Sequence, residues 1–167
     1  MLDIYTLGEE VLTERAKPVK TFDSALGILV DAMFETMEEA DGVGLAAPQV
    51  GVSQRLFVID VRDGKQWTFI NPEIIATSEE CESAEEGCLS IPGVFSDVSR
   101  AARVTVQAQN LQGKPFTVEA EGLFARAIQH ELDHLNGVLF IDRLDKEEHD
   151  RAVKSFERLN KKRRSRA

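Results

Sequence analysis

Two histidines four residues apart, in the segment QHELDH, constrain the fold of this chain more than any other feature. On an α-helix, His130 and His134 lie on one face about one turn apart and can bind one metal ion, with Glu131 beside the first. We expect this helix to run from about Leu123 to Gly137. Because two ligands rarely complete a metal site, a third ligand must come from a distant segment that folds against this helix.

The familiar extension of this motif does not supply the third ligand. The pattern H-E-x-x-H-x-x-G-x-x-H fits as far as Gly137, but Phe140 stands where the last histidine should be. The remaining candidates are an acidic side chain, His149 and the two cysteines. His149 falls on the polar side of the predicted last helix, and Cys81 lies in a polar stretch, so we expect both at the surface.

Cys88 is the strongest candidate for the third ligand. In EEGCLSIPG it follows Gly87, which permits a close approach of the backbone to another element, and it precedes an expected turn at Pro92–Gly93. Without the histidine pair, it would be interpreted as a small buried apolar residue. With that pair, a cysteine and two histidines leave the fourth position to water, which is the open arrangement of a catalytic metal site.

Hydrophobic periodicity predicts the other elements. Apolar residues at helical spacing predict a helix over 23–40, strands are predicted at 55–60 and 67–72, and alternation predicts a hairpin of 103–109 with 116–122. A last helix is predicted from 146 to 164, with Ala152, Val153, Phe156 and Leu159 buried. These elements show no βαβ alternation. They predict one α+β domain spanning residues 1–167, with antiparallel strands around a central metal-binding helix and with N-terminal and C-terminal helices.

Composition and charge narrow the class of protein. The chain is 43% hydrophobic and 29% charged, and its longest apolar run, ALGILV, is too short to cross a bilayer. We therefore expect a globular protein of the cytoplasm, without a signal peptide, membrane association or disulfide bond. The net charge of −9 argues against broad nucleic-acid binding, although the basic end at 161–167 permits a local polyanionic partner.

Three segments together resemble the signature segments of the peptide deformylases. They are GVGLAAPQ (42–49), EGCLS (86–90) and QHELDH (129–134), in the family's order. The resemblance covers nearly the whole chain. It implies a metallohydrolase that removes the N-terminal formyl group from the initiating formyl-methionine of nascent polypeptides. Formate would be released by attack of a metal-bound hydroxide on the formyl carbon.

The resemblance also assigns the catalytic roles. It implies that Cys88, His130 and His134 bind one divalent metal, with Fe²⁺ as the ion in the cell and Zn²⁺, Ni²⁺ or Co²⁺ as substitutes in vitro. Glu131 would act as the general base and return the proton to the leaving amine. The side chain of Gln49 and the backbone N–H of Leu89 would donate hydrogen bonds to the oxyanion. Read alone, Gln49 is an ordinary polar loop residue.

The expected substrates are N-formylmethionyl peptides. A peptide could lie as an added strand beside the glycines of GVGLAAPQ, with its methionine side chain in an apolar pocket. The candidate substrate-binding residues are Val43, Gly44, Leu89, Leu123 and Ala127, and for each of them core packing is the alternative interpretation. The implied partner of the basic end at 161–167 is ribosomal RNA near the polypeptide exit, unless these cations serve only the helix dipole. We expect a monomer.

Supporting contacts around the metal ligands are less constrained by the sequence. Asp133 and Gln129 could hydrogen-bond the far ring nitrogens of the histidines, although Asp133 could equally be a solvated helix residue. Glu86 could pair with Arg100 or Arg103 to brace the Cys88 segment.

Two other functions fit part of the pattern. An H-E-x-x-H protease or another metal-dependent amidase would need a third ligand downstream of His134 and would cleave unformylated peptides. A binding module without catalysis would need a fourth protein ligand to close the metal site, and Cys81 is the only ready candidate. The resemblance favours the deformylase over both.

Overall fold

The computed structural model describes residues 1–166, so Ala167, the last residue of the predicted basic end, lies outside the described residues. The helices and strands are, in chain order, the 3-10 helix η1 (Glu10–Thr13), α1 (Ser24–Glu39), β1 (Gly44–Ala46), the 3-10 helix η2 (Ala47–Val50), β2 (Leu56–Ile59), β3 (Trp67–Thr77), β4 (Cys81–Cys88), β5 (Ile91–Ala101), β6 (Arg103–Gln109), β7 (Pro115–Glu121), α2 (Gly122–Leu135), the 3-10 helix η3 (Phe140–Arg143) and α3 (Lys146–Arg166).

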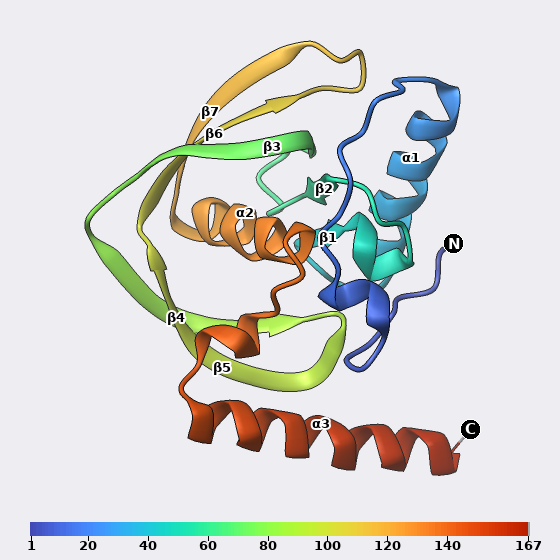
Figure 1. Ribbon diagram of the computed structural model, residues 1–167, viewed down its shortest axis with the longest axis vertical. Helices are drawn as coiled ribbons and strands as arrows, with labels where there is room; N and C mark the ends of the chain where they lie inside the picture. The colour runs from blue at the N-terminus through green and yellow to red at the C-terminus, as the bar shows by residue number, and fades with distance from the viewer. Residues whose placement is uncertain (167) are drawn as a thin grey trace.

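Two antiparallel sheets enclose the helix that carries the histidines. The larger sheet has the strand order β1-β2-β3-β6-β7, and β4 and β5 form a separate two-stranded sheet. Helix α2 lies between them and contacts β1, β2 and β7 on one side and β5 on the other (Figure 1). The predicted α+β fold, with antiparallel strands around a central helix, is therefore confirmed.

Helix α1 follows directly from its sequence. The Asp23 carboxylate caps its start by accepting a hydrogen bond of 3.1 Å from the Leu26 backbone N–H. The predicted apolar stripe is buried, and it packs on Leu45, Val58 and Ile70 of the larger sheet. This packing fixes the segment after the helix, residues 42–51, against the edge of that sheet.

Helix α2 begins and ends where glycines permit it. Gly122 has φ of +61° and lets the chain pass from β7 straight into the helix. The helix ends at Leu135, two residues before the predicted end at Gly137. Gly137 has φ of +74°, and a Cβ there would lie 2.5 Å from the Thr13 carbonyl oxygen, so a side chain would clash with the N-terminal segment.

The hairpin of β4 and β5 corrects one sequence-based prediction. The chain turns at Leu89 and Ser90, because Cys88 pairs directly with Ile91, and not at Pro92–Gly93, which lie inside β5. A proline is tolerated there because a two-stranded sheet leaves edge positions that need no N–H donor. Periodicity did not reveal β4, because its residues 81–85 are all exposed and show no alternation of apolar and polar side chains.

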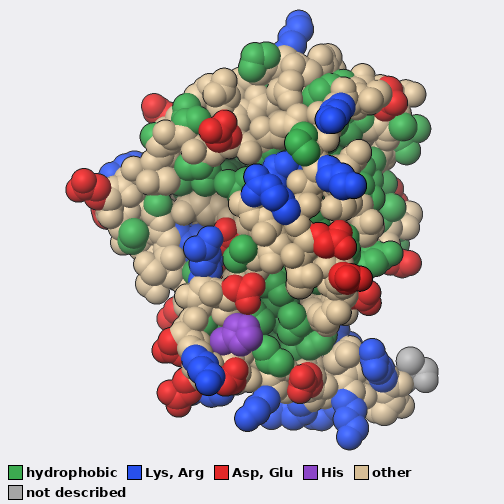
Figure 2. All heavy atoms as spheres, in the orientation of Figure 1, with side chains coloured by type: hydrophobic (Ala, Val, Ile, Leu, Met, Phe, Trp, Pro, Cys, Tyr) green, Lys and Arg blue, Asp and Glu red, His purple; other side chains and the backbone are tan. Residues whose placement is uncertain are grey.

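Helix α3 packs outside the smaller sheet. Of the four side chains predicted to be buried, Ala152 and Phe156 are buried and contact an apolar cluster that includes Val94, Val98 and Phe140, whereas Val153 and Leu159 are only partly buried. Lys and Arg side chains gather along the lower edge of the molecule, where α3 lies (Figure 2). Within residues 1–166, no helix is both long enough and apolar enough to span a membrane.

Candidate metal centre

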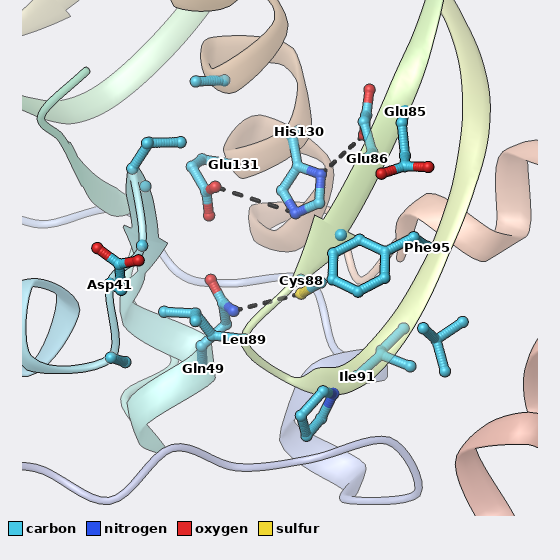
Figure 3. A pocket seen from close by; sticks show the side chains of 18 of the residues that line it. Asp41, Gln49, Glu85, Glu86, Cys88, Leu89, Ile91, Phe95, His130 and Glu131 are labelled. Carbon is cyan, nitrogen blue, oxygen red and sulfur yellow. Dashed lines mark hydrogen bonds and ion pairs between the residues drawn. The ribbon is translucent and has the colours of Figure 1, made fainter. Parts of the chain in front are cut away.

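The fold brings together one cysteine and two histidines from distant segments. Cys88 stands at the end of β4, and His130 and His134 lie on consecutive turns of α2. One ligand atom from each lies within 4.8 Å of the others. The Cys88 Sγ and the His134 Nε2 are 3.3 Å apart, and both histidines are buried. Figure 3 shows the thiol and the His130 ring facing the same space.

These three side chains fit a divalent transition metal. With bonds of about 2.3 Å to sulfur and about 2.0 Å to nitrogen, two ligands of a tetrahedral ion lie about 3.5 Å apart, close to the observed separation. A thiolate with two imidazoles suits iron, zinc, nickel and cobalt. Glu131 Oε1 is buried beside this site and has no hydrogen-bond partner within residues 1–166, as expected of an oxygen that meets a group at the open position.

Glu86 orients the first histidine. Its Oε1 lies 2.9 Å from the His130 Nδ1, which leaves Nε2 free to face Cys88. The same carboxylate accepts hydrogen bonds of 2.6 Å from Arg100 Nε and from Arg126 Nη1. Burial alone would raise the pKa of Glu86, but the hydrogen bonds from His130 and Arg100 lower it to about 2. Arg103, the alternative partner, instead pairs with an exposed glutamate.

The predicted contacts of Asp133 and Gln129 with the histidine rings are wrong. Asp133 accepts hydrogen bonds of 2.9 Å from Arg100 Nη1 and 2.7 Å from Arg143 Nη2. The Gln129 amide bonds the backbone of Ala101. Both side chains therefore connect α2 to neighbouring segments. The sequence could not rank Asp133 against Glu86, because that choice depends on which strand lies behind the helix.

Replacing Glu86 should strongly destabilise the protein. In Glu86→Gln, Arg126 loses its carboxylate partner and Arg100 keeps only Asp133, so we expect the free energy of unfolding to fall by about 3–5 kcal/mol. The matched control is Glu80→Gln, which removes an exposed ion pair with Arg103 and should cost at most about 1 kcal/mol. Urea unfolding at pH 7 measures both values. Equal losses in the two variants would contradict this account of the buried network.

The contribution of Glu86 to the free energy of unfolding should decrease as the pH is lowered. The pKa of this carboxyl is lowered in the folded state from 4.5 to about 2, so its contribution to stability is fully present above about pH 4.5. It should be lost as the pH falls through about 2. The difference in unfolding free energy between wild type and Glu86→Gln, measured from pH 6 down to pH 3, should therefore shrink toward acid. A constant difference would argue against an ionised Glu86.

Glu131 lies over the open side of the three candidate ligands. Its side chain is 5% exposed, and Oε2 lies 4.0 Å from His130 Nε2. Burial raises the pKa of Glu131 to about 7, against the opposing charges of His130 and Arg100. A carboxyl with a pKa in this range can both accept and return a proton near neutral pH, although a bound cation would lower the value.

Gly44 provides the space in which the Glu131 carboxylate lies. A Cβ at position 44 would lie 2.6 Å from Glu131 Oε2 and 3.0 Å from its Cδ. This role was not evident from the sequence, which indicated only that the glycine leaves its backbone accessible.

Gly44→Ala should therefore lower the kcat of a hydrolysis that uses the Glu131 carboxylate. The added methyl must displace the Glu131 carboxylate, and an error of about 1 Å in the position of a catalytic group can cost about 100-fold. We expect bound metal to remain at one ion per chain, because the three atoms nearest to this methyl all belong to Glu131, which is not a candidate ligand. Kinetics with metal analysis test this expectation. A variant that loses its metal, or keeps wild-type kcat, would contradict it.

Gln49 and Leu89 lie next to Cys88 and apart from Glu131 (Figure 3). The Gln49 Oε1 accepts a hydrogen bond of 2.9 Å from the Ala46 N–H, which orients its Nε2 toward the site. That Nε2 lies 3.1 Å from Ser90 Oγ and 3.5 Å from Cys88 Sγ. Leu89 is in the turn directly after Cys88. Two candidate hydrogen-bond donors are thus adjacent to the thiol.

A cavity of about 590 Å³ adjoins this centre. Its wall includes all the predicted substrate-binding residues, and among the ligands it reaches Cys88 and His130. Phe95 and Arg126, which no sequence pattern indicated, also line it. Phe95 is 62% exposed, and neither residue belongs to a pattern that would mark it. The predicted substrate-binding residues on the wall are Val43, Gly44, Leu89, Leu123 and Ala127.

The two rejected ligand candidates lie elsewhere. Cys81 is exposed at the other end of β4. His149 lies near the start of α3, where its Nε2 is 3.4 Å from Asp142 of η3. Neither belongs to the cluster of Cys88 with the two histidines.

Comparisons with known proteins agree with the resemblance of the three sequence segments. The family profile described as polypeptide deformylase matches residues 1–150. A peptide deformylase of Thermotoga neapolitana is 54% identical over 144 residues, which are 86% of this chain and 87% of that protein.

Solved structures agree with this match. The crystal structure of a peptide deformylase from Legionella pneumophila has a TM-score of 0.94 at 45% identity, covering 98% of this chain and 97% of that one. One from Synechococcus elongatus, in complex with actinonin, has a TM-score of 0.88 at 45% identity, covering 92% and 86%.

Proposed function

The chain belongs to the polypeptide deformylase family, and we propose that it removes the formyl group from the N-terminal formyl-methionine of nascent polypeptides in the cytoplasm. The observation that carries this proposal is the convergence of Cys88, His130 and His134 beside the buried carboxylate of Glu131, at one end of an open cavity. Three ligands leave a position for water, as hydrolysis requires.

The roles of the side chains follow from their positions. A divalent cation at this centre would supply an acidified water molecule and an electrophilic contact for the formyl oxygen. Glu131 takes the proton from the attacking water and returns it to the departing amine nitrogen. The Gln49 side-chain N–H and the Leu89 backbone N–H donate to the oxygen that becomes negatively charged. The buried setting of these donors strengthens their electrostatic effect.

The peptide is proposed to bind along the free edge of β1. Within residues 1–166, this strand lies at the edge of the larger sheet with β2 as its one neighbour, so its outer edge can accept an extended peptide. The methionine side chain would enter the cavity toward Leu123 and Ala127. The residues that follow methionine can extend out of the site, because the cavity is open to solvent.

The test is release of formate from formyl-Met-Ala-Ser by protein prepared without oxygen and loaded with Fe²⁺. We expect rapid release and no cleavage of the peptide Met-Ala-Ser. No formate from a sample with one metal per chain would refute the proposal. Cleavage of the unformylated peptide would instead favour the metalloprotease or general amidase.

We also propose Fe²⁺ as the ion in the cell, because the thiolate and two imidazoles suit it and the family implies it. Ferrous iron beside a thiolate is sensitive to oxygen. Exposure to air should therefore inactivate iron-loaded protein faster than nickel-loaded protein. Equal rates of inactivation would argue against this assignment.

We propose that the protein is a monomer. We also propose that it docks on ribosomes through the basic end of α3. Residues 161–165 are exposed and carry four positive charges, from Lys161, Lys162, Arg163 and Arg164. A chain that ends before Lys161 should no longer sediment with ribosomes. Unchanged sedimentation would leave only a role in helix stability or solubility.

A further inference from the structure

The first residues of the chain contact two segments that lie beside the candidate metal centre. We call residues 4–8 the N-terminal strap. The Tyr5 N–H donates a hydrogen bond of 2.7 Å to the Gln49 carbonyl oxygen, and the Leu7 N–H donates one of 2.9 Å to the Ser90 carbonyl oxygen. In Figure 1 this dark blue segment lies beside η2 and the turn between β4 and β5. The proposed mechanism gives this strap no role.

The two acceptors belong to the segments that carry the candidate oxyanion donors. Gln49 is itself one of them, and Ser90 directly follows Leu89, the other. The two segments come from different sheets, since η2 continues β1 and the turn joins β4 to β5. Their side chains also meet, because Gln49 Nε2 lies 3.1 Å from Ser90 Oγ. The strap therefore fixes the backbone on both sides of this side-chain contact.

A tight turn presents the Leu7 N–H to Ser90. The Glu9 N–H donates a hydrogen bond of 3.0 Å to the Thr6 carbonyl oxygen, and Gly8 has φ of +103°. A glycine with positive φ at the third position of such a turn is typical of type II, and Leu7 occupies the second position. The Leu7 N–H is not used within the turn, so it can bond to the neighbouring segment.

We infer that the N-terminal strap is a positioning element for the oxyanion donors, and that the Leu7 N–H holds the turn that carries the Leu89 N–H. The inference rests on the proposed function, because it assumes that Gln49 and Leu89 act on the formyl oxygen. Such donors stabilise the transition state more than the bound substrate. Loosening the turn should therefore lower kcat more than it raises KM.

Leu7→Pro tests the Leu7 N–H, with Leu7→Ala as its matched control. Proline is common at the second position of a type II turn, so the substitution keeps the backbone while it deletes the donor. Alanine loses a comparable part of the side chain and keeps the N–H. With metal-loaded enzyme and formyl-Met-Ala-Ser, we expect Leu7→Pro to lower kcat about tenfold relative to Leu7→Ala, since small displacements of catalytic groups are costly. KM and metal content should change little.

A second variant guards against misfolding of Leu7→Pro. At Gly8 a Cβ would meet no atom within 4 Å, but valine strongly disfavours the positive φ, so Gly8→Val should shift the Leu7 N–H without a clash. Its kcat should fall as well, while the metal content stays at one ion per chain.

Three outcomes are informative. A larger kcat loss in Leu7→Pro than in Leu7→Ala, with KM and metal content retained, supports the inference. Equal kcat in the two variants, or losses confined to KM or to metal content, would overturn it while the proposed function stands. A wild-type enzyme that releases no formate would overturn the proposed function and this inference together.

Discussion

Glu131→Gln is expected to lower kcat by about three orders of magnitude while the protein keeps one metal ion per chain. The amide has nearly the shape of the carboxylate and still fits over Gly44, but it cannot accept the proton of the attacking water. None of the three candidate metal ligands is altered, so the lost activity would report the proton transfer. This prediction separates the proposed base from the metal site that surrounds it.

Formate release and metal analysis on the same preparation measure this effect. Glu82→Gln is a matched control, since Glu82 is exposed on β4 and lies outside the cavity wall. The control should keep wild-type activity. If Glu131→Gln retained more than about a tenth of wild-type kcat, the proton would have to be accepted by another group, and the role assigned to Glu131 would be wrong.

Cys88→Ala should abolish metal binding and activity together, whereas Cys81→Ala should preserve both. Without the thiolate, two imidazoles remain, and they lack the negative charge and the third bond that hold a divalent ion. Cys81 is exposed, and its Sγ donates a hydrogen bond of 3.8 Å to the carbonyl oxygen of neighbouring Glu79. The chain has two cysteines, so each serves as the control for the other.

Metal content per chain, measured after gel filtration, decides between the two cysteines. Loss of metal from Cys81→Ala would point to a site closed by four protein ligands and would favour the binding module without catalysis. Metal retained by Cys88→Ala would remove the cysteine from the ligand set. Either result would contradict the centre described above.

The sequence determined the elements whose signals are local. Helix α1 was predicted from its apolar stripe, and the hairpin of β6 and β7 from alternation. The spacing of His130 and His134 indicated a helix, because a helix places residues four apart on one face only about one turn from each other, close enough to bind one metal ion. The interpretation of Cys88 as the third ligand depended on the histidine pair and on the family resemblance. Local periodicity does not connect residues 42 positions apart.

Only the tertiary structure decided what surrounds these residues. Glu86, rather than Asp133, bonds the His130 ring, because β4 lies behind that face of α2 while Asp133 points toward Arg143. Gly44 proved to be the space for the Glu131 carboxylate, and the N-terminal strap proved to bond the backbone of Gln49 and of Ser90, which follows Leu89. A buried charge is stabilised by whichever partners the fold brings near it. Those partners come from distant segments, so no local pattern in the sequence could identify them.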